Sequence, residues 1–390
     1  MSALGAFDAV LDEAVAAGDV PGVVALAADA RGVIYRRAAG VRGRDDPAPM
    51  AENSVFWLAS MTKAVTSVAA MQLVEARKLA LDAPIAPVLP ELADRPVLDG
   101  FDDAGHPRLR RALRPITLRH LLTHTAGFGY DIWNAAIRRV MAEAGVPHAI
   151  SRRRAALQTP LLFDPGAQWA YGVSTDFVGR AVEAVSGCTL RDYFRAHILG
   201  PLGMHDTDFI PTPAMRARRV RMHQREADGR LTPIDFDPTA GAEFFMGGGG
   251  LHGTGADYLR VLRMLLAGGA LDGAQILRPD TVALMAENQI GDLEAGRLQS
   301  VQPETSNDVD FFPGMSQKWG LGFLINTADG RHGRKAGSLA WAGLGNTYFW
   351  IDRAANLTGV MLMQILPFAD RKAVALYGAF ERALYQGRAA

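Results

Sequence analysis

The stretch from Trp57 to Leu79 contains a serine and a lysine whose spacing could support chemistry. It begins with small and polar residues and continues as a run of mainly Ala, Val, Met and Leu without Gly or Pro, which predicts a long, largely buried helix. Ser60 lies near its start, and Lys63 follows three residues later. Because a helix turns once in about 3.6 residues, the two side chains should share one face, one turn apart.

This placement predicts a nucleophilic serine. A serine hydroxyl is a poor nucleophile until a base takes its proton, and a neutral amine within hydrogen-bond reach can be that base. Burial against the apolar helix and the positive end of the helix dipole both disfavour the ammonium form of Lys63. The same helix start would offer the backbone N–H of Ser60 to an oxyanion forming on a substrate carbonyl.

The Ser-x-x-Lys spacing alone is also compatible with an N-cap serine followed by a surface lysine. Two observations favour the chemical interpretation. The chain holds only five lysines, and Lys63 is the only one that lies three residues after a serine. It also lies where the predicted helix is least polar, which is an unusual position for a solubilising charge.

The composition is that of an ordinary globular protein. With 390 residues, 49% of them hydrophobic and 21% charged, the chain can build a large core, either as two domains or as one composite domain. Its formal net charge of zero gives no electrostatic reason to expect nucleic acid or an anionic membrane as a partner.

Targeting and redox signals are also absent from the sequence. The N-terminal stretch lacks the basic start of a secretory signal, and no apolar run is long enough to span a bilayer. Cys188 is the only cysteine, so an intrachain disulfide or a thiolate metal cluster is excluded. We therefore expect a cytoplasmic protein without a membrane or nucleic-acid partner.

The order of the strands and helices expected along the chain predicts two domains, which together must position the serine. Strands are expected near both ends of the chain, at 20–29, 32–40, 319–326, 334–338, 347–351 and 358–364, with a helix at each terminus, the second at 371–385. Helices are expected at 116–123, 134–145, 151–159, 174–186, 254–267 and 278–288. Residues 1–59 and 244–390 should form one discontinuous α/β domain and residues 60–243 a mainly helical domain. A cleft between them would suit a small-molecule site.

Three further stretches contain residues that could take part in chemistry. His120 and His124 have the spacing of a helical metal pair, but no glutamate occupies the metalloprotease position and no third ligand is evident, so we expect no metal site. Tyr171 is either a core residue or a cleft phenol that shuttles protons beside a cation. The Gly and Ala residues of 336–346 permit close backbone approach at a strand edge, although Trp341 could equally be a core aromatic.

Together these stretches resemble the serine β-lactamase and penicillin-binding-protein superfamily, and within it the class C-like esterase branch, the family VIII carboxylesterases. The segment at 121–127, Leu-Leu-Thr-His-Thr-Ala-Gly, is similar to one common in this group. Ser60-Met-Thr-Lys63 is similar to the Ser-x-x-Lys motif of the superfamily, and Tyr171-Gly-Val173 is similar to its tyrosine motif. Trp341-Ala-Gly343 occupies the place of the Lys-Thr-Gly motif, as its Trp-x-Gly variant.

The resemblance implies a β-lactamase/transpeptidase-like fold, in which a central antiparallel sheet is flanked by helices and a helical domain is inserted. It implies that Ser60 is acylated, with Lys63 and Tyr171 acting together as base and then acid. The backbone N–H groups of Ser60 and Leu344 would form the oxyanion hole. Trp341 would line the acyl pocket, and Gly343 would be small for packing reasons.

Two departures from the β-lactamase pattern bear on the substrate. Val173 stands where β-lactamases usually carry an asparagine that binds the substrate amide, and Trp341 replaces the lysine that attracts the β-lactam carboxylate. Both changes favour neutral esters. Phe128 and Phe245 could contact the substrate, but each is equally compatible with the core.

The sequence therefore predicts a serine carboxylesterase that acts on small to medium, mostly neutral esters and needs no metal or organic cofactor. An acyltransferase, an amide hydrolase or a weak β-lactamase on the same fold is the alternative. A non-catalytic binding protein is the alternative from another class, although such a protein would be expected to lose the serine, lysine or tyrosine.

Overall fold

An eight-stranded antiparallel sheet forms the centre of the computed structural model, which describes residues 3–389. The strands of this sheet are β1 (Gly22–Ala28), β2 (Val33–Gly43), β3 (Asp46–Pro49), β14 (Gln317–Trp319), β15 (Leu324–Asn326), β16 (Leu339–Gly343), β17 (Thr347–Asp352) and β18 (Leu357–Leu362). Their spatial order is β14-β15-β16-β17-β18-β1-β2-β3. The two ends of the chain thus meet inside one sheet, where Leu26 of β1 is paired with Val360 of β18.

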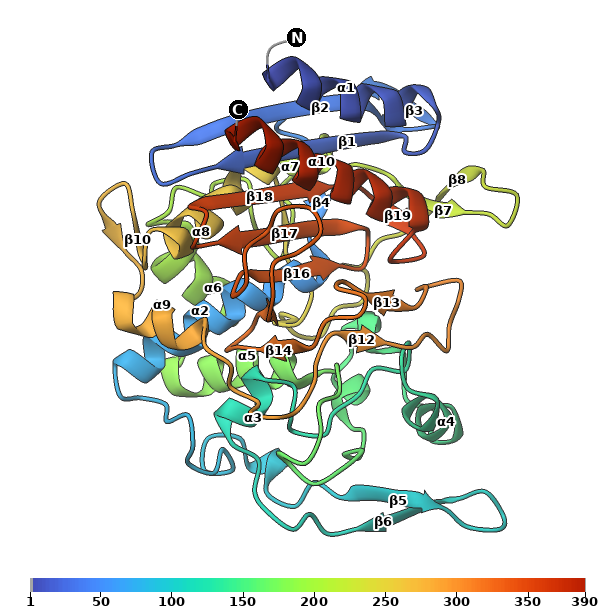
Figure 1. Ribbon diagram of the computed structural model, residues 1–390. Helices are drawn as coiled ribbons and strands as arrows, with labels where there is room; N and C mark the ends of the chain where they lie inside the picture. Colours follow the sequence, from blue (N-terminus) through green and yellow to red (C-terminus); the bar gives the residue numbers. More distant parts are fainter. Residues whose placement is uncertain (1–2, 390) are drawn as a thin grey trace.

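Helices cover both faces of this sheet (Figure 1). The terminal helices α1 (Ala3–Ala16) and α10 (Arg371–Ala389) pack together on one face, and α8 (Gly255–Leu266) packs on the other. Neighbouring residues of β17 show the division, because Trp350 contacts Tyr377 of α10 while Phe349 contacts Tyr258 of α8. The fold class expected from the sequence, a central antiparallel sheet flanked by helices, is confirmed.

The middle of the chain supplies the helices that lie below the sheet in Figure 1. The remaining helices are α2 (Thr62–Glu75), α3 (Leu118–Leu122), α4 (Ala135–Glu143), α5 (Ser174–Ser186), α6 (Leu190–Phe194), α7 (Pro213–Arg216) and α9 (Pro279–Met285). Among them, α2 packs against α5, and α5 packs in turn against α3 and α6. No helix within residues 3–389 is both long and apolar enough to cross a membrane.

Short strands outside the central sheet complete the structure. They are β4 (Phe56–Trp57), β5 (Val97–Phe101), β6 (Pro107–Arg110), β7 (Met222–Arg225), β8 (Leu231–Ile234), β9 (His252–Gly253), β10 (Ala270–Leu271), β11 (Ala274–Gln275), β12 (Arg297–Leu298), β13 (Val309–Asp310) and β19 (Ile365–Leu366). The segment predicted to be mainly helical therefore also contains two strand pairs, β5 with β6 and β7 with β8. The proposed domain boundaries at 60 and 244 stay a prediction.

The predicted helix over Trp57–Leu79 begins later than expected. Trp57 belongs to β4, which is paired with β9, and Ser60 lies in a 3-10 turn, Ala59–Met61, that leads into α2. Ala59 has a φ of 47°, a left-handed conformation that an α-helix cannot include. The backbone therefore bends sharply just before Ser60.

Three other sequence predictions were wrong in detail. The strand expected at 319–326 is two strands, β14 and β15, because Gly322 with a φ of 100° turns the chain between them. The stretch 334–338 is a turn held by the side chain of Asn326, which donates to the carbonyl of Lys335. Residues 151–159 form only short 3-10 turns, since Arg152 takes a left-handed φ of 56°.

Candidate active site

Ser60 lies where the central sheet meets α2. The 3-10 turn that carries it contacts both β16 and β17. β16 can approach this closely because residue 343 is a glycine: a Cβ there would lie 2.3 Å from the carbonyl oxygen of Leu58. Leu344, which follows β16, lines the same pocket as Ser60. The two residues predicted to form the oxyanion hole are therefore brought together by the fold.

Lys63 lies in the first turn of α2, with its side chain only 1% exposed. Its Nζ is 3.1 Å from Ser60 Oγ, 3.2 Å from Tyr130 Oη and 2.7 Å from the carbonyl oxygen of Gly248. Burial lowers the pKa of Lys63 to about 7, and the negative charge of Asp176 opposes this change. A large fraction of this amine is therefore neutral near pH 7, as a general base requires.

Tyr171 precedes α5 and is also buried. Its hydroxyl oxygen accepts a hydrogen bond from Trp341 Nε1 over 2.9 Å, and its ring centroid lies 4.7 Å from Lys63 Nζ. Burial raises the pKa of Tyr171, while hydrogen bonds with Ser60 and Trp341 act in the opposite direction. The phenol thus stays protonated near neutral pH and can donate a proton beside the serine.

Tyr130 was not assigned a chemical role from the sequence. It accepts a hydrogen bond from Lys63, and its ring centroid lies 5.2 Å from that of Tyr171. Burial raises the pKa of Tyr130 well above its usual value. Its backbone N–H also donates to the carbonyl of Tyr171 over 3.1 Å, which ties the two segments together. The phenol rings of Tyr130 and Tyr171 therefore both lie close to Lys63 Nζ.

Asp176 is a second residue that the sequence did not indicate. It lies in the first turn of α5 and is buried, and its Oδ1 accepts the backbone N–H of Gly248 over 2.8 Å. Burial raises the pKa of Asp176 to about 6, and the charge of Lys63 acts against this rise. The available signal in the sequence is the run of four glycines at 247–250. A Cβ at Gly248 would lie 2.8 Å from Asp176 Oδ2, so close packing requires glycine there.

A narrow pocket of about 20 Å³ opens beside Ser60. No charged side chain lines it, and its walls are largely apolar. The lining residues are Trp57, Ala59, Ser60, Tyr130, Ile132, Trp133, Ile150, Met246, Gly248, Gly249 and Leu344.

The predicted substrate contacts lie outside the lining of this pocket. Trp341 contacts Tyr171, and Val173 is buried between Tyr171 and the start of α5. Phe128 is 0% exposed and stacks on Phe177, which favours a core role. Phe245 packs against Phe209. Neither phenylalanine is among the residues that line the pocket, and the same holds for Trp341, Val173 and Gly343.

His120 and His124, which have the spacing of a metal-binding pair, lie in different surroundings. His120 takes part in a capping box with Thr117, and His124 is buried with its ring against Trp319 and Tyr171. Burial and the charge of Lys63 lower the pKa of His124 well below its usual value. Within residues 3–389 no cluster of three or more His, Cys, Asp or Glu side chains has the arrangement of a metal site.

Comparison with known proteins decides the family. Residues 7–383 match the model of the family described as Beta-lactamase. The chain belongs to the β-lactamase family. The resemblance of its motifs to the serine β-lactamase and penicillin-binding-protein superfamily, including its esterases, is thereby confirmed.

Similar members of the β-lactamase family are named for ester chemistry. The chain is 35% identical to monacolin J acid methylbutanoyltransferase of Aspergillus terreus, covering 96% of this chain and 93% of that protein. It is 33% identical to lovastatin esterase of Penicillium rubens, covering 97% and 98%. A structure of simvastatin synthase from Aspergillus terreus superposes with a TM-score of 0.86 at 33% identity, covering 100% of this chain and 98% of that one. This β-lactamase-family protein is thus an enzyme of the serine hydrolase and acyltransferase type.

Proposed function

We propose that the protein is a serine carboxylesterase that cleaves small to medium, mostly neutral esters through an acyl-enzyme on Ser60. The observation that carries the substrate class is the pocket beside Ser60, whose lining is apolar and contains no charged side chain. Such a lining favours contact with an apolar acyl group, whereas an anionic one would lose its hydration without gaining a partner.

In the first half of the reaction, Ser60 Oγ attacks the ester carbonyl carbon while its proton passes to Lys63. The 3.1 Å distance between Ser60 Oγ and Lys63 Nζ allows this transfer directly, and the lowered pKa of Lys63 supplies the neutral amine. The C–O bond of the tetrahedral intermediate then breaks. Tyr171, which hydrogen-bonds with Ser60, gives a proton to the departing alkoxide and recovers one from Lys63.

The negative oxygen of the intermediate needs donors that are fixed in place. Backbone N–H groups of Ser60 and Leu344 are assigned this role because both residues line the same pocket. In the second half, a water molecule loses a proton to the Lys63–Tyr171 pair and attacks the acyl carbon. Ser60 leaves with a returned proton, so the free enzyme and a carboxylic acid are regenerated.

The first test is labelling with a p-nitrophenyl alkylphosphonate, followed by intact mass measurement and peptide mapping. We expect one adduct per chain, on Ser60, with loss of p-nitrophenyl butyrate hydrolysis in proportion to labelling. Ser60→Ala should neither be labelled nor hydrolyse the ester, while Ser54→Ala serves as the matched control and should do both. An adduct on another residue, or full turnover by Ser60→Ala, would refute the proposal.

Acyl transfer is the second candidate, favoured because a relative identical at 35% is named a methylbutanoyltransferase. The same acyl-enzyme would serve, with an alcohol in place of water. Product partitioning between acid and a new ester, measured over a series of added alcohols, distinguishes the two. Dominant ester formation at millimolar alcohol would identify a transferase, and predominant acid would identify an esterase.

A further inference from the structure

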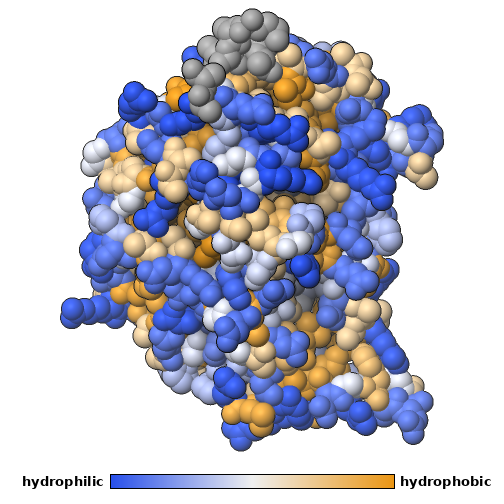
Figure 2. Space-filling view, in the orientation of Figure 1, coloured by the Kyte–Doolittle hydropathy of each residue, from blue (hydrophilic) through white to orange (hydrophobic). Residues whose placement is uncertain are grey.

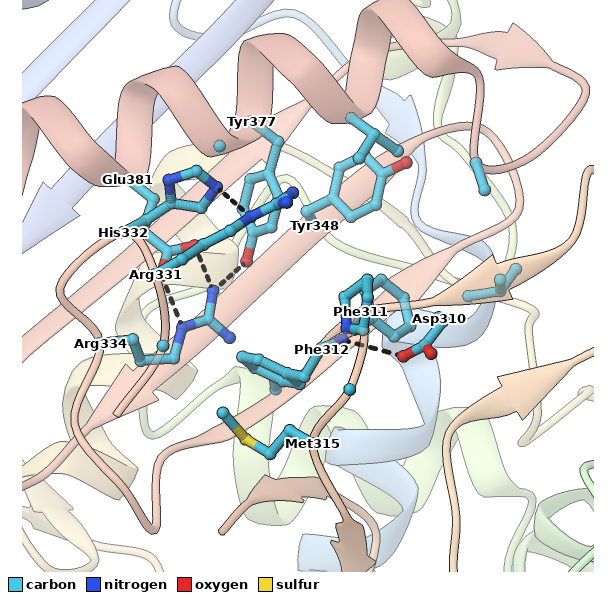
Figure 3. Close-up of a pocket in the computed structure, with 18 of the residues that line it drawn as sticks. Asp310, Phe311, Phe312, Met315, Arg331, His332, Arg334, Tyr348, Tyr377 and Glu381 are labelled. Atoms are coloured by element: carbon cyan, nitrogen blue, oxygen red, sulfur yellow. Dashed lines mark hydrogen bonds and ion pairs between the residues drawn. The ribbon is translucent and has the colours of Figure 1, made fainter. Parts of the chain in front are cut away.

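A second cavity, of about 810 Å³, lies on the α10 side of the central sheet (Figure 3). Its walls are α10, the segment 308–316 and the connection between β15 and β16. Tyr348 of β17 lines it and stacks on Tyr377 of α10, which places the cavity on that face. Ser60, Lys63 and Tyr171 do not line it. Its volume is that of a site for a drug-sized molecule.

Aromatic side chains supply the apolar surface of this cavity. Phe311 and Phe312 come from the segment 308–316, and Tyr348 and Tyr377 lie opposite (Figure 3). Flat rings on facing walls suit a planar or extended apolar body.

Arg334 contributes a charged side chain to the lining of this cavity. Its side chain is 3% exposed; Nε and Nη2 donate to Glu381, and Nη2 also donates to Tyr377. Nη1 has no hydrogen-bond partner among the described residues, and Arg334 lines the cavity, so the N–H donors of Nη1 remain available to a ligand there. Figure 3 shows this nitrogen without a dashed line, beside Phe312.

The charges around the cavity leave an excess of open cationic groups. Glu381 is paired with Arg334, Asp329 with Lys335, and Asp310 with Arg297. Arg331 and Arg371 also line the cavity, and among residues 3–389 neither lies within ion-pair distance of a carboxylate. In the same described range, Asp308 is the lining carboxylate without an ion-pair partner, and its Oδ1 accepts the backbone N–H of Ser300, so two open guanidinium groups stand against one open carboxylate. Charge complementarity therefore favours a ligand with a negative group.

We propose that this cavity is a second binding site, separate from Ser60, for a medium-sized apolar carboxylic acid. The apolar body lies between the aromatic rings, and the carboxylate accepts hydrogen bonds from Arg334 Nη1 and from the guanidinium groups of Arg331 and Arg371. The site goes beyond the proposed esterase activity and does not depend on it.

The test must separate this cavity from the catalytic pocket, because Trp341 both lines the cavity and holds Tyr171. Isothermal titration with 2-naphthoate is therefore carried out on the wild type and on enzyme whose Ser60 is already phosphonylated; if Ser60 does not react, the wild type and the cavity variants decide. We expect saturable binding of one naphthoate per chain. The uncharged 2-acetylnaphthalene should bind about tenfold more weakly, because it lacks the charge-assisted hydrogen bonds.

Variants assign the binding to this cavity. Arg331→Gln and Arg371→Gln should each weaken naphthoate binding severalfold, and Val374→Phe should abolish it by filling the space beside α10. Arg353→Gln is the matched control, since Arg353 is exposed and does not line the cavity. If Val374→Phe unfolds, the arginine variants decide alone. No saturable binding to the blocked enzyme, or equal affinity in the wild type and both arginine variants, would overturn the proposal.

Discussion

Lys63 Nζ donates a hydrogen bond to the carbonyl oxygen of Gly248 over 2.7 Å, and the N–H of that glycine donates to Asp176 over 2.8 Å. One glycine therefore connects the amine and the carboxylate, which act on each other through space. Burial lowers the pKa of Lys63, and the charge of Asp176 limits that decrease. This arrangement keeps the amine near the midpoint of its titration at neutral pH.

The first prediction concerns the pH dependence of catalysis. Only neutral Lys63 can take the serine proton, so kcat/KM for p-nitrophenyl butyrate should rise with pH and level off above the lowered pKa of about 7. The measurement is initial rates from pH 5 to 9, corrected for spontaneous hydrolysis. A rate independent of pH across this range would exclude Lys63 as the titrating base.

Asp176→Asn should move this profile to lower pH. The amide can still accept the N–H of Gly248, but the negative charge that raises the pKa of Lys63 is gone, so the amine becomes neutral at a lower pH. We expect the midpoint of the acidic limb to fall by about one pH unit.

Other groups near Lys63 must be considered in that experiment. His124, Tyr130 and Tyr171 also face it, but the lowered pKa of His124 and the raised pKa values of the tyrosines keep them uncharged across this range. Asp257→Asn is the matched control. Asp257 also lies in the first turn of a helix, has a raised pKa through burial and bonds Thr207, away from the site. An equal shift in both variants would contradict the assignment.

The two buried tyrosines should differ in their effect on turnover. Tyr171→Phe removes the hydroxyl that bonds with Ser60 and should lower kcat by about 10³-fold, as expected for loss of a general acid. Tyr130→Phe removes only an acceptor for Lys63 and should lower kcat by about tenfold.

A double-mutant cycle checks the role of Trp341. Trp341→Phe removes the donor to Tyr171 Oη, so its effect on kcat should nearly vanish in the Tyr171→Phe background. Steady-state kinetics of the four proteins give the coupling. Additive losses, or a larger loss for Tyr130→Phe than for Tyr171→Phe, would mean that the tyrosine roles are wrongly assigned.

The part of the site that could be predicted rests on local spacing and on motif order. Ser60 and Lys63 are three residues apart in the chain, so the local geometry of the 3-10 turn that continues into α2 brings their side chains together. Family resemblance added Tyr171, because its motif follows at a recognisable distance. The expected sheet from both ends of the chain is confirmed because β1, β17 and β18 are strongly apolar runs, and β2 follows β1 after a short turn.

Contacts between distant segments could not be predicted. Lys63 is separated by 67 residues from Tyr130 and by 185 from Gly248, and Asp176 lies 72 residues from Gly248. No periodicity connects such positions. The left-handed φ of Ala59 could not be predicted either, because alanine favours a helix, whereas this turn lies in contact with β16 and β17, which are distant in the chain.

The last prediction concerns stability. Lys63 is almost fully buried, and its pKa falls from 10.5 in the unfolded chain to about 7 in the folded protein. Between these values the unfolded chain binds more protons, so the free energy of unfolding should rise with pH across this range.

Lys63→Met keeps the length of the side chain and removes the titration. At pH 7 it should raise the free energy of unfolding by about 2 kcal/mol, once the lost hydrogen bonds are counted, while abolishing turnover. Urea denaturation at pH 7 and pH 9.5 measures this, with the exposed Lys78→Met as control. The gain should shrink at the higher pH, whereas a destabilised variant at pH 7 would show that the folded protein binds the charged amine well and that its pKa is not lowered.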